Sequence, residues 1–212
     1  MKARLAAVVA LAVVSLLAGN GIAAASALSP LPPLQIRNGV LTVCLNATAQ
    51  RAFTADGLRM AAIAPATYST TADGRSCVKF TVVGESNLDI TEAHATLPGG
   101  FDFGNAAGRH LTLTGLDVRT RGMSLVATAK VNNQPGPVDV FYVNVLRANI
   151  QPQLLPLGVK LATQCMLTGQ LASVMGTTLG AAPLAGDTAM LAAVGSADLG
   201  PSLLSSSVGQ AS

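Results

Sequence analysis

An alternation of apolar and polar residues with a period of two constrains the fold of this chain most strongly. It runs from Leu58 to Val145 and is interrupted by turn signals. The clearest stretch is Met123 to Val131, where only Val126 breaks the alternation. Because successive side chains of a β-strand point to opposite faces, the pattern predicts antiparallel strands with one buried face. We therefore expect a mainly β fold, either an antiparallel β-sandwich or a rolled sheet.

Glycine and proline divide this region into segments. Asp73-Gly74 and Pro98 to Gly100 predict turns, and Arg119 to Gly122 predicts a hairpin into the strand that follows. Near Gly115 the apolar phase shifts by one residue. A glycine at such a shift is typical of a β-bulge.

Two short helices are predicted near the two ends of the domain. The first follows a strand from Gln35 to Leu45 and runs from Thr48 to Ala55, with Asn46 or Thr48 as its N-cap. The second follows a strand at Val159 and covers Thr168 to Ala172. The same order, strand and then helix, thus occurs twice.

Residues Met1 to Ala27 have the features of a cleavable export signal. Lys2 and Arg4 precede an apolar run that is too short to cross a bilayer, and Ala25-Ser26-Ala27 supplies the small residues of a cleavage site. We therefore expect a secreted, extracellular protein, loosely associated with the cell wall at most. No transmembrane segment is expected after cleavage.

The rest of the chain is expected to form one domain with short flanks. A Pro-rich spacer covers residues 28–36, a single β-rich domain covers 37–199, and a disordered tail covers 200–212. Cleavage removes two cations from the 13 Lys and Arg and leaves 11 against 10 acidic residues, so the net charge falls from +3 to about +1. These scattered charges, with an aromatic content of 3%, argue against nucleic-acid binding.

Three cysteines lie in the exported part of the chain, where thiols are usually oxidised. Cys44 and Cys77 are each out of phase with the apolar residues around them, so both should lie on the less apolar faces of their strands. This pattern predicts a structural disulfide between Cys44 and Cys77, although Cys165 could replace either partner. No Cys-x-x-Cys spacing supports a metal site.

Two histidines and two tyrosines are the candidate ligand-binding residues. His94 should share a strand face with Glu92, as a proton-transfer pair or half of a metal site would, but a polar strand end is the simpler interpretation. His110 should face solvent or a groove. Packing is the simpler interpretation of Tyr68 and Tyr142. A tyrosine with a histidine is nevertheless a set that can hold ferric haem.

No catalytic motif is present. The sequence contains no Gly-x-Ser-x-Gly elbow, no phosphate-binding Gly-x-x-x-x-Gly-Lys and no His-Glu-x-x-His. Asp102 and Asp117 are interpreted as isolated carboxylates, because nothing pairs them for glycosidase chemistry. The chain is therefore predicted not to be an enzyme.

The order of these segments resembles the HtaA-like domain of secreted bacterial envelope proteins. The matching stretches are Gly39 to Val43 with its helix, Gly99 to Phe103, His110 to Val118, Leu125 to Ala129, and the closing Leu161 strand with its helix and Met175 to Thr178. The resemblance spans about Gly39 to Gly180. It implies an extracellular β-rich domain, some members of which bind haem through a tyrosine and a nearby histidine. This chain departs from that pattern, since it has no aromatic segment with the early tyrosine, and neither His94 nor His110 falls on the expected ligand position.

Two functions are compatible with these observations. The first is a ligand-binding module that holds haem or another small apolar molecule beside His94, His110, Tyr68 or Tyr142. The second is a structural or adhesive protein of the cell envelope that has no small-molecule ligand and uses strand faces rich in Thr and Ser.

Overall fold

The computed structural model describes residues 34–86, 92–132 and 134–200. The predicted export signal, residues 28–33 of the predicted spacer and residues 201–212 of the predicted tail lie outside these residues, whereas residues 34–36 of the spacer belong to the first strand. The strands are β1 (Leu34–Leu45), β2 (Leu58–Ile63), β3 (Thr67–Thr70), β4 (Ser76–Ser86), β5 (Ala93–Asn105), β6 (His110–Arg121), β7 (Ser124–Val131), β8 (Pro137–Asn144), β9 (Asn149–Leu154), β10 (Leu157–Leu167) and β11 (Ala189–Gly200). The helices are α2 (Ala47–Ala55), α3 (Gly169–Leu179) and the 3-10 turn η2 (Val145–Arg147). In the described ranges, no helix has both the length and the apolar character needed to cross a membrane.

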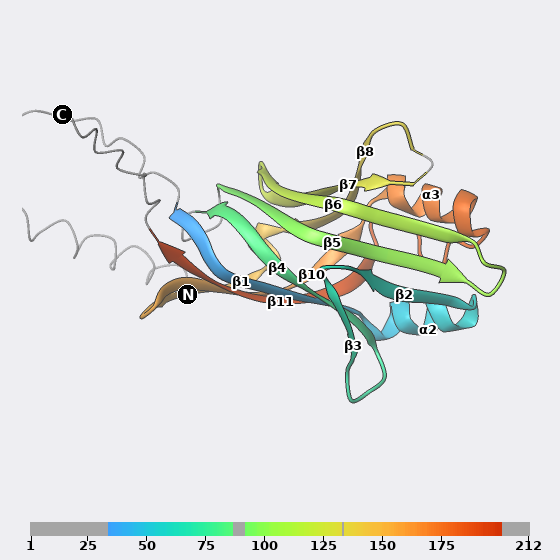
Figure 1. Cartoon of the computed structure of the whole chain (residues 1–212), viewed down its shortest axis with the longest axis horizontal. Helices are drawn as coiled ribbons and strands as arrows, with labels where there is room; N and C mark the ends of the chain where they lie inside the picture. Colours follow the sequence, from blue (N-terminus) through green and yellow to red (C-terminus); the bar gives the residue numbers. More distant parts are fainter. Residues whose placement is uncertain (1–33, 87–91, 133, 201–212) are drawn as a thin grey trace, which may run out of the picture. The chain divides into compact units, whose positions relative to one another are not determined.

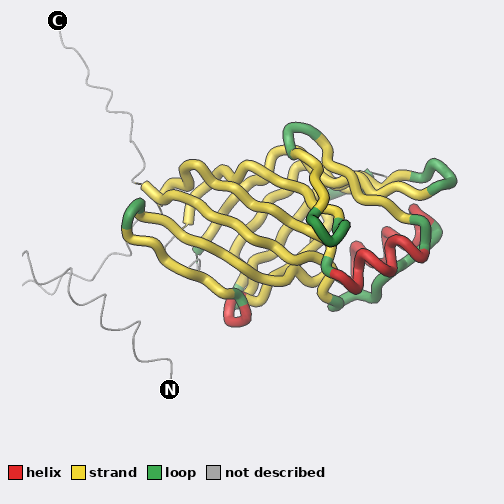
Figure 2. Tube along the Cα trace, turned by 90° about the horizontal axis from the view of Figure 1, so that it is seen from below, coloured by secondary structure: helices red, strands yellow, loops and turns green. Residues whose placement is uncertain are grey.

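Eight of the strands form a closed antiparallel barrel (Figure 2). Their order is β5-β6-β7-β8-β10-β11-β1-β4, and β4 pairs again with β5 to complete the ring. The predicted mainly β fold with two short helices is confirmed, but the predicted sandwich or rolled sheet is wrong. Closure depends on pairs between distant segments, such as β1 with β11, which an alternation of residues along one strand does not reveal.

The barrel wall divides along β5, which means that β5 changes its hydrogen-bonded neighbour on one side part-way along its length. Residues Ala93 to Thr96 pair with β4, whereas Gly100 to Asn105 pair with β2. Between them Gly99 has a φ of +97°, and a Cβ atom there would lie 2.4 Å from the carbonyl oxygen of Ile63, so only glycine fits. The turn predicted at Pro98 to Gly100 is therefore wrong, because this segment is the point within β5 where the wall divides. Past this point of division, β2 and β3 diverge from each other (Figure 1).

Other local predictions are confirmed. The phase shift near Gly115 is a change of register between Thr114 and Asp117, and Gly115 has a φ of +60°. β6 and β7 form the predicted hairpin, in which Arg121 lies opposite Ser124. The glycine thus allows both parts of β6 to keep their apolar side chains inside the barrel.

Both predicted helices are present. α2 begins after Asn46, whose Oδ1 accepts a hydrogen bond from the backbone N–H of Ala49 at 2.8 Å. The Asn46 Nδ2 donates to the carbonyl oxygen of Ala189 at 2.6 Å, which ties the start of α2 to β11. α3 has Thr168, the first residue of the predicted helix, as its N-cap and extends seven residues past the predicted end at Ala172.

All five phenylalanines are buried in the core. The ring centroid of Phe101 lies 5.1 Å from that of Phe80, 5.8 Å from Phe103 and 5.9 Å from Phe141. Phe53 of α2 adds an edge-to-face contact with Phe103 at 5.7 Å. Through Phe53, α2 is packed against the end of the barrel at which the wall divides.

Candidate functional site

A pocket of about 580 Å³ lies where the barrel wall divides, and we call it the Tyr68 pocket. Its apolar lining comes from Leu45, Phe53, Leu58, Met60 and Ala61, and its polar lining includes Gln50, Arg59, Tyr68 and Ser76. The elements around it are α2, β2, β3 and the adjoining ends of β1 and β4. The volume is within the range of about 300 to 1,000 Å³ that is usual for small-molecule sites.

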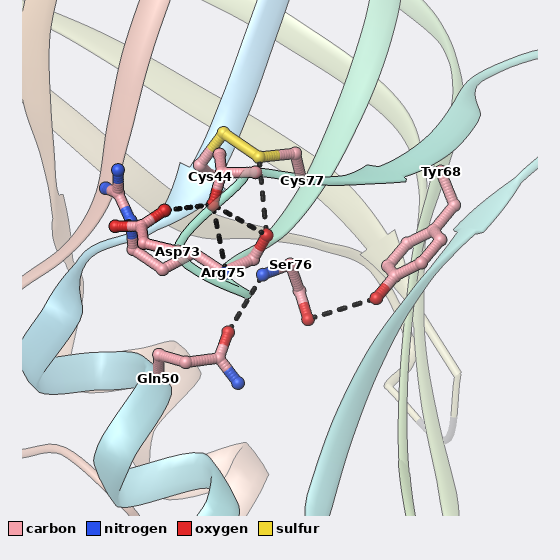
Figure 3. Close-up of a disulfide and its surroundings, with 8 residues drawn as sticks. Cys44, Gln50, Tyr68, Asp73, Arg75, Ser76 and Cys77 are labelled. Atoms are coloured by element: carbon pink, nitrogen blue, oxygen red, sulfur yellow. Dashed lines mark hydrogen bonds and ion pairs between the residues drawn. A yellow bond between two sulfur atoms is a disulfide. The ribbon is translucent and has the colours of Figure 1, made fainter.

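Tyr68 is the aromatic side chain at the open side of this pocket. It lies on the short strand β3, opposite Val78 of β4, and it is 49% exposed. Its hydroxyl lies 3.2 Å from the Ser76 Oγ (Figure 3). Tyr68 is therefore not the core packing residue that the sequence favoured, since its phenol lies at the boundary between an apolar pocket and solvent.

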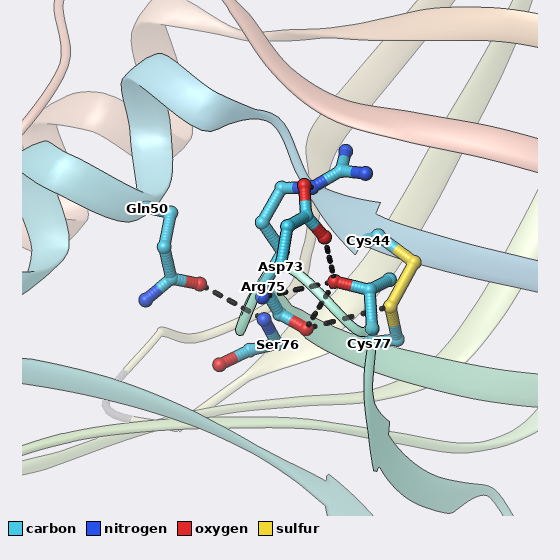
Figure 4. Close-up of polar contacts among 7 residues, drawn as sticks. Cys44, Gln50, Asp73, Arg75, Ser76 and Cys77 are labelled. Atoms are coloured by element: carbon cyan, nitrogen blue, oxygen red, sulfur yellow. Dashed lines mark hydrogen bonds and ion pairs between the residues drawn. A yellow bond between two sulfur atoms is a disulfide. The ribbon is translucent and has the colours of Figure 1, made fainter.

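The strand that supports Tyr68 is held from two sides (Figures 3 and 4). The backbone N–H of Ser76 donates to the Gln50 Oε1 of α2 at 2.9 Å. Beside Ser76, the disulfide between Cys44 and Cys77 is present as predicted and joins β1 to β4. Cys165 is a free, partly exposed thiol, and desolvation by the surrounding residues raises its pKa to about 12.

The turn between β3 and β4 is the one predicted at Asp73-Gly74. Gly74 has a φ of +79°, and the Asp73 carboxylate accepts hydrogen bonds from the Thr71 hydroxyl and from the Arg75 Nε, the latter at 2.7 Å. The Thr71 bond, followed by Arg75, lowers the pKa of the Asp73 carboxyl. This small network fixes the end of the hairpin that carries Tyr68 (Figure 4).

Among the described residues that line the pocket, Arg59 is the one that carries a charge. It lies on β2 opposite Gly104 of β5, which in turn lies opposite His110 of β6. A Cβ atom on Gly104 would lie 3.1 Å from the His110 Cε1, so the imidazole covers this glycine. The His110 Nδ1 is 3.0 Å from the Asp102 Oδ1, and Asp102 is thus not isolated. His110 faces outward, as predicted, and lies two strands away from Arg59.

His94 lies at the opposite end of β5. Its Nε2 is 3.0 Å from the Asp117 Oδ2, and the Arg119 Nε is 2.7 Å from the other oxygen of the same carboxylate. The Arg119 bond, with a smaller contribution from His94, lowers the pKa of Asp117, which is therefore not isolated either. Ten residues, or about 33 Å, separate His94 from Gly104 along the strand. Glu92 lies directly before the first residue of β5, and its predicted pairing with His94 on one strand face stays a prediction.

Tyr142 belongs to a different environment. It lies on β8, and its hydroxyl donates to the Asp187 Oδ1 at 3.0 Å. This hydrogen bond to a carboxylate raises the pKa of the Tyr142 phenol, so the group is held in its protonated form. Tyr142 therefore contacts a carboxylate, whereas the Tyr68 hydroxyl contacts the neutral hydroxyl of Ser76. The described residues contain no group of three or more side chains suited to hold a metal ion.

The structure thus separates the four predicted site residues. It places Tyr68 in the pocket and His110 outside the lining, two strands from Arg59, with His94 and Tyr142 elsewhere. Gln50, Arg59 and Ser76 also line the pocket and were not among the residues predicted from the sequence. Arg59 does fall in the outward phase between two apolar residues of β2, but no sequence pattern indicates that β2 and β3 diverge there.

The fold is similar to that of the C-terminal domain of HtaA from Corynebacterium glutamicum. The two share 13% sequence identity with a TM-score of 0.57, over 79% of this chain and 99% of that domain. The heme-binding protein HtaB from the same organism is also similar, with 12% identity and a TM-score of 0.45 over 77% of this chain and 96% of that one. No family model and no curated protein matches the sequence. The resemblance to the HtaA-like domain is thus confirmed for the fold.

Proposed function

We propose that this chain is an exported, non-catalytic domain that binds haem in the Tyr68 pocket. The observation that carries the proposal is the half-exposed phenol of Tyr68 at the edge of an apolar pocket of about 580 Å³. Some members of the HtaA-like family bind haem through a tyrosine, and the pocket contains a tyrosine, although this chain lacks the early aromatic segment of that pattern. Export follows from the predicted signal at Met1 to Ala27.

The chemistry of the lining fits a haem. The faces of a porphyrin are apolar, and Phe53, Leu58 and Met60 give the pocket apolar walls. The two propionates of haem are anionic, and Arg59 is a cation at the pocket surface that could pair with one of them. The Tyr68 oxygen is the donor that a ferric iron would take, and a bound haem would supply that iron centre.

The surrounding residues hold the phenol in place. Ser76 contacts the Tyr68 hydroxyl and is itself fixed by Gln50 of α2. When Tyr68 loses its proton, the Ser76 hydroxyl can donate to the phenolate oxygen and stabilise its charge. Of the two histidines, His110 is the nearer to this site by strand register, at two strands from Arg59.

Filling the pocket tests where haem binds. Ala61 is an exposed alanine of the lining, and Ala61→Trp would occupy the space without disturbing the core. We expect hemin titrations, followed by the Soret band, to show binding to the wild type and binding weakened about tenfold or more in Ala61→Trp, because the indole excludes the porphyrin. Ala162→Trp is the matched control, since Ala162 is an exposed alanine on β10 outside this pocket.

Two outcomes would contradict the proposal. If the wild type gives no Soret shift, the chain does not bind haem, and retention on cell-wall material would then favour the structural or adhesive alternative. If both tryptophan variants bind like the wild type, haem binds at another place. Equal thermal unfolding of the three proteins would show that the comparison reports on the pocket and not on folding.

A further inference from the structure

The turn between β9 and β10 carries the most exposed apolar residue in the described part of the chain. Leu154 lies opposite Leu157 at the end of the hairpin, so Leu155 and Pro156 form the turn itself. Leu155 is 94% exposed and Leu154 is 71% exposed. Turn positions are usually occupied by Gly, Asn, Asp or Ser, which are compatible with water, and two adjacent leucines here are unusual. We call Leu154 to Leu157 the leucine tip.

The leucine tip lies far from the Tyr68 pocket. Next to the tip, Gly158 of β10 pairs with Asp198 of β11, and Asp198 pairs with Arg37 near the start of β1. The pocket is lined by Leu45 at the other end of β1, eight residues or about 25 Å away. The tip therefore belongs to the end of the barrel that is remote from α2.

The edge of β9 is not suited to pairing with another strand. β9 pairs with β10 alone in the described residues. Its sequence contains Pro152, which has no backbone N–H, flanked by the polar residues Gln151 and Gln153. These are features by which sheet edges avoid strand addition. A binding partner would therefore contact the side chains of the leucines and would not pair with the backbone of β9.

The positive charge of a lysine near the tip favours binding to an anionic surface. Lys160 is exposed on β10, three residues or about 10 Å from Leu157, and has no acidic partner among the described residues. The nearby carboxylate of Asp198 accepts a hydrogen bond from the Asn38 Nδ2 at 3.2 Å and lies opposite Arg37. Lys160 is therefore the charged side chain of β10, and it lies exposed on the same strand as the tip.

We propose that the leucine tip inserts into the surface layer of a lipid membrane that contains anionic headgroups. A stable protein interface buries about 800 Å² on each partner, and a turn with two leucines offers far less. A lipid layer needs no complementary surface, because any protruding aliphatic side chain can enter the boundary between headgroups and acyl chains. Lys160, behind the tip, then lies at the depth of the lipid phosphates. This contact would hold the Tyr68 pocket away from the membrane and open to solvent.

Flotation with lipid vesicles tests this proposal. The purified mature protein is mixed with vesicles of phosphatidylcholine alone or of phosphatidylcholine with a minority of phosphatidylglycerol. We expect the wild type to float with the anionic vesicles, and Leu155→Ser to partition about tenfold less, because the polar side chain cannot replace the buried leucine. Val194→Ser is the control, since Val194 is also an exposed apolar residue, at 62%, and lies on the outer face of β11 outside the tip. It should float like the wild type.

The results that would contradict the membrane contact differ from those that would contradict haem binding. Failure of the wild type to float with either vesicle would overturn the membrane contact and leave the hemin titration unaffected. Equal losses in Leu155→Ser and Val194→Ser would show a non-specific effect and would also overturn it. A concentration-dependent dimer that Leu155→Ser abolishes, measured by sedimentation equilibrium without lipid, would replace the membrane with a second copy of the chain.

Discussion

Replacing Phe101 with alanine is expected to destabilise the protein by about 3 to 5 kcal/mol, the range for truncation of a buried aromatic ring. Phe101 is 2% exposed and contacts the rings of Phe80, Phe103 and Phe141. It also lines a cavity of about 90 Å³ inside the barrel, so its removal would enlarge an existing void. Eight paired strands surround this void and limit its collapse, which favours the upper part of the range. Urea unfolding followed by circular dichroism would measure the change in the free energy of unfolding.

Val83→Ala provides the comparison for Phe101→Ala. Val83 is an exposed apolar residue of β4, and its truncation is expected to change the free energy of unfolding by less than about 0.5 kcal/mol. A loss below about 1 kcal/mol for Phe101→Ala would mean that the ring is not at the centre of the core. Such a result would conflict with the aromatic contacts on which the barrel packing is based.

Loss of the disulfide is expected to have an effect of similar size. The bond closes a loop with a sequence separation of 33, for which the entropy of the unfolded chain predicts a stabilisation of about 3 to 4 kcal/mol. Replacing Cys44 and Cys77 together with alanine should therefore lower the free energy of unfolding by about that amount. Because the bond lies beside Ser76 and the Tyr68 hairpin, we expect weaker hemin binding as well.

Reduction of the wild type serves as an internal control for the disulfide. Dithiothreitol should lower the unfolding midpoint of the wild type to that of the double variant and leave the variant itself unchanged. If reductant has no effect on the wild type, the cysteines are not bonded in the purified protein. If Cys165→Ala alone removes the sensitivity, the bond uses Cys165 and the pairing described above is wrong.

Local features of the fold could be predicted because they depend on neighbouring residues. The alternation from Met123 to Val131 gave β7 within one residue, and the phase shift at Gly115 located a real change of register. The out-of-phase positions of Cys44 and Cys77 led to the correct pair, since both strands keep their apolar residues inside the barrel. Asn46 was recognisable as a helix cap from its type and position.

The closed barrel and the pocket could not be predicted in this way. Gly99 has the sequence environment of a turn, and only its contact with Ile63 shows that the wall divides there. The pocket forms because β2 and β3 then diverge around α2, which brings Arg59, Gln50 and Tyr68 together from three elements. Such contacts between distant segments leave no periodic signal in the chain. For the same reason the histidines, which look alike in sequence, lie at opposite ends of β5 and β6.

The proposed role of Tyr68 is tested most directly by the absorption and electron paramagnetic resonance spectra of the ferric haem complex. We compare Tyr68→Phe with Tyr142→Phe, which removes the same hydroxyl from the other tyrosine. The wild type and Tyr142→Phe should both show a charge-transfer band and a high-spin signal of phenolate-bound ferric haem, and Tyr68→Phe should lose both. Retention of these signals in Tyr68→Phe, or their loss in Tyr142→Phe, would contradict the assignment of Tyr68 as the haem ligand.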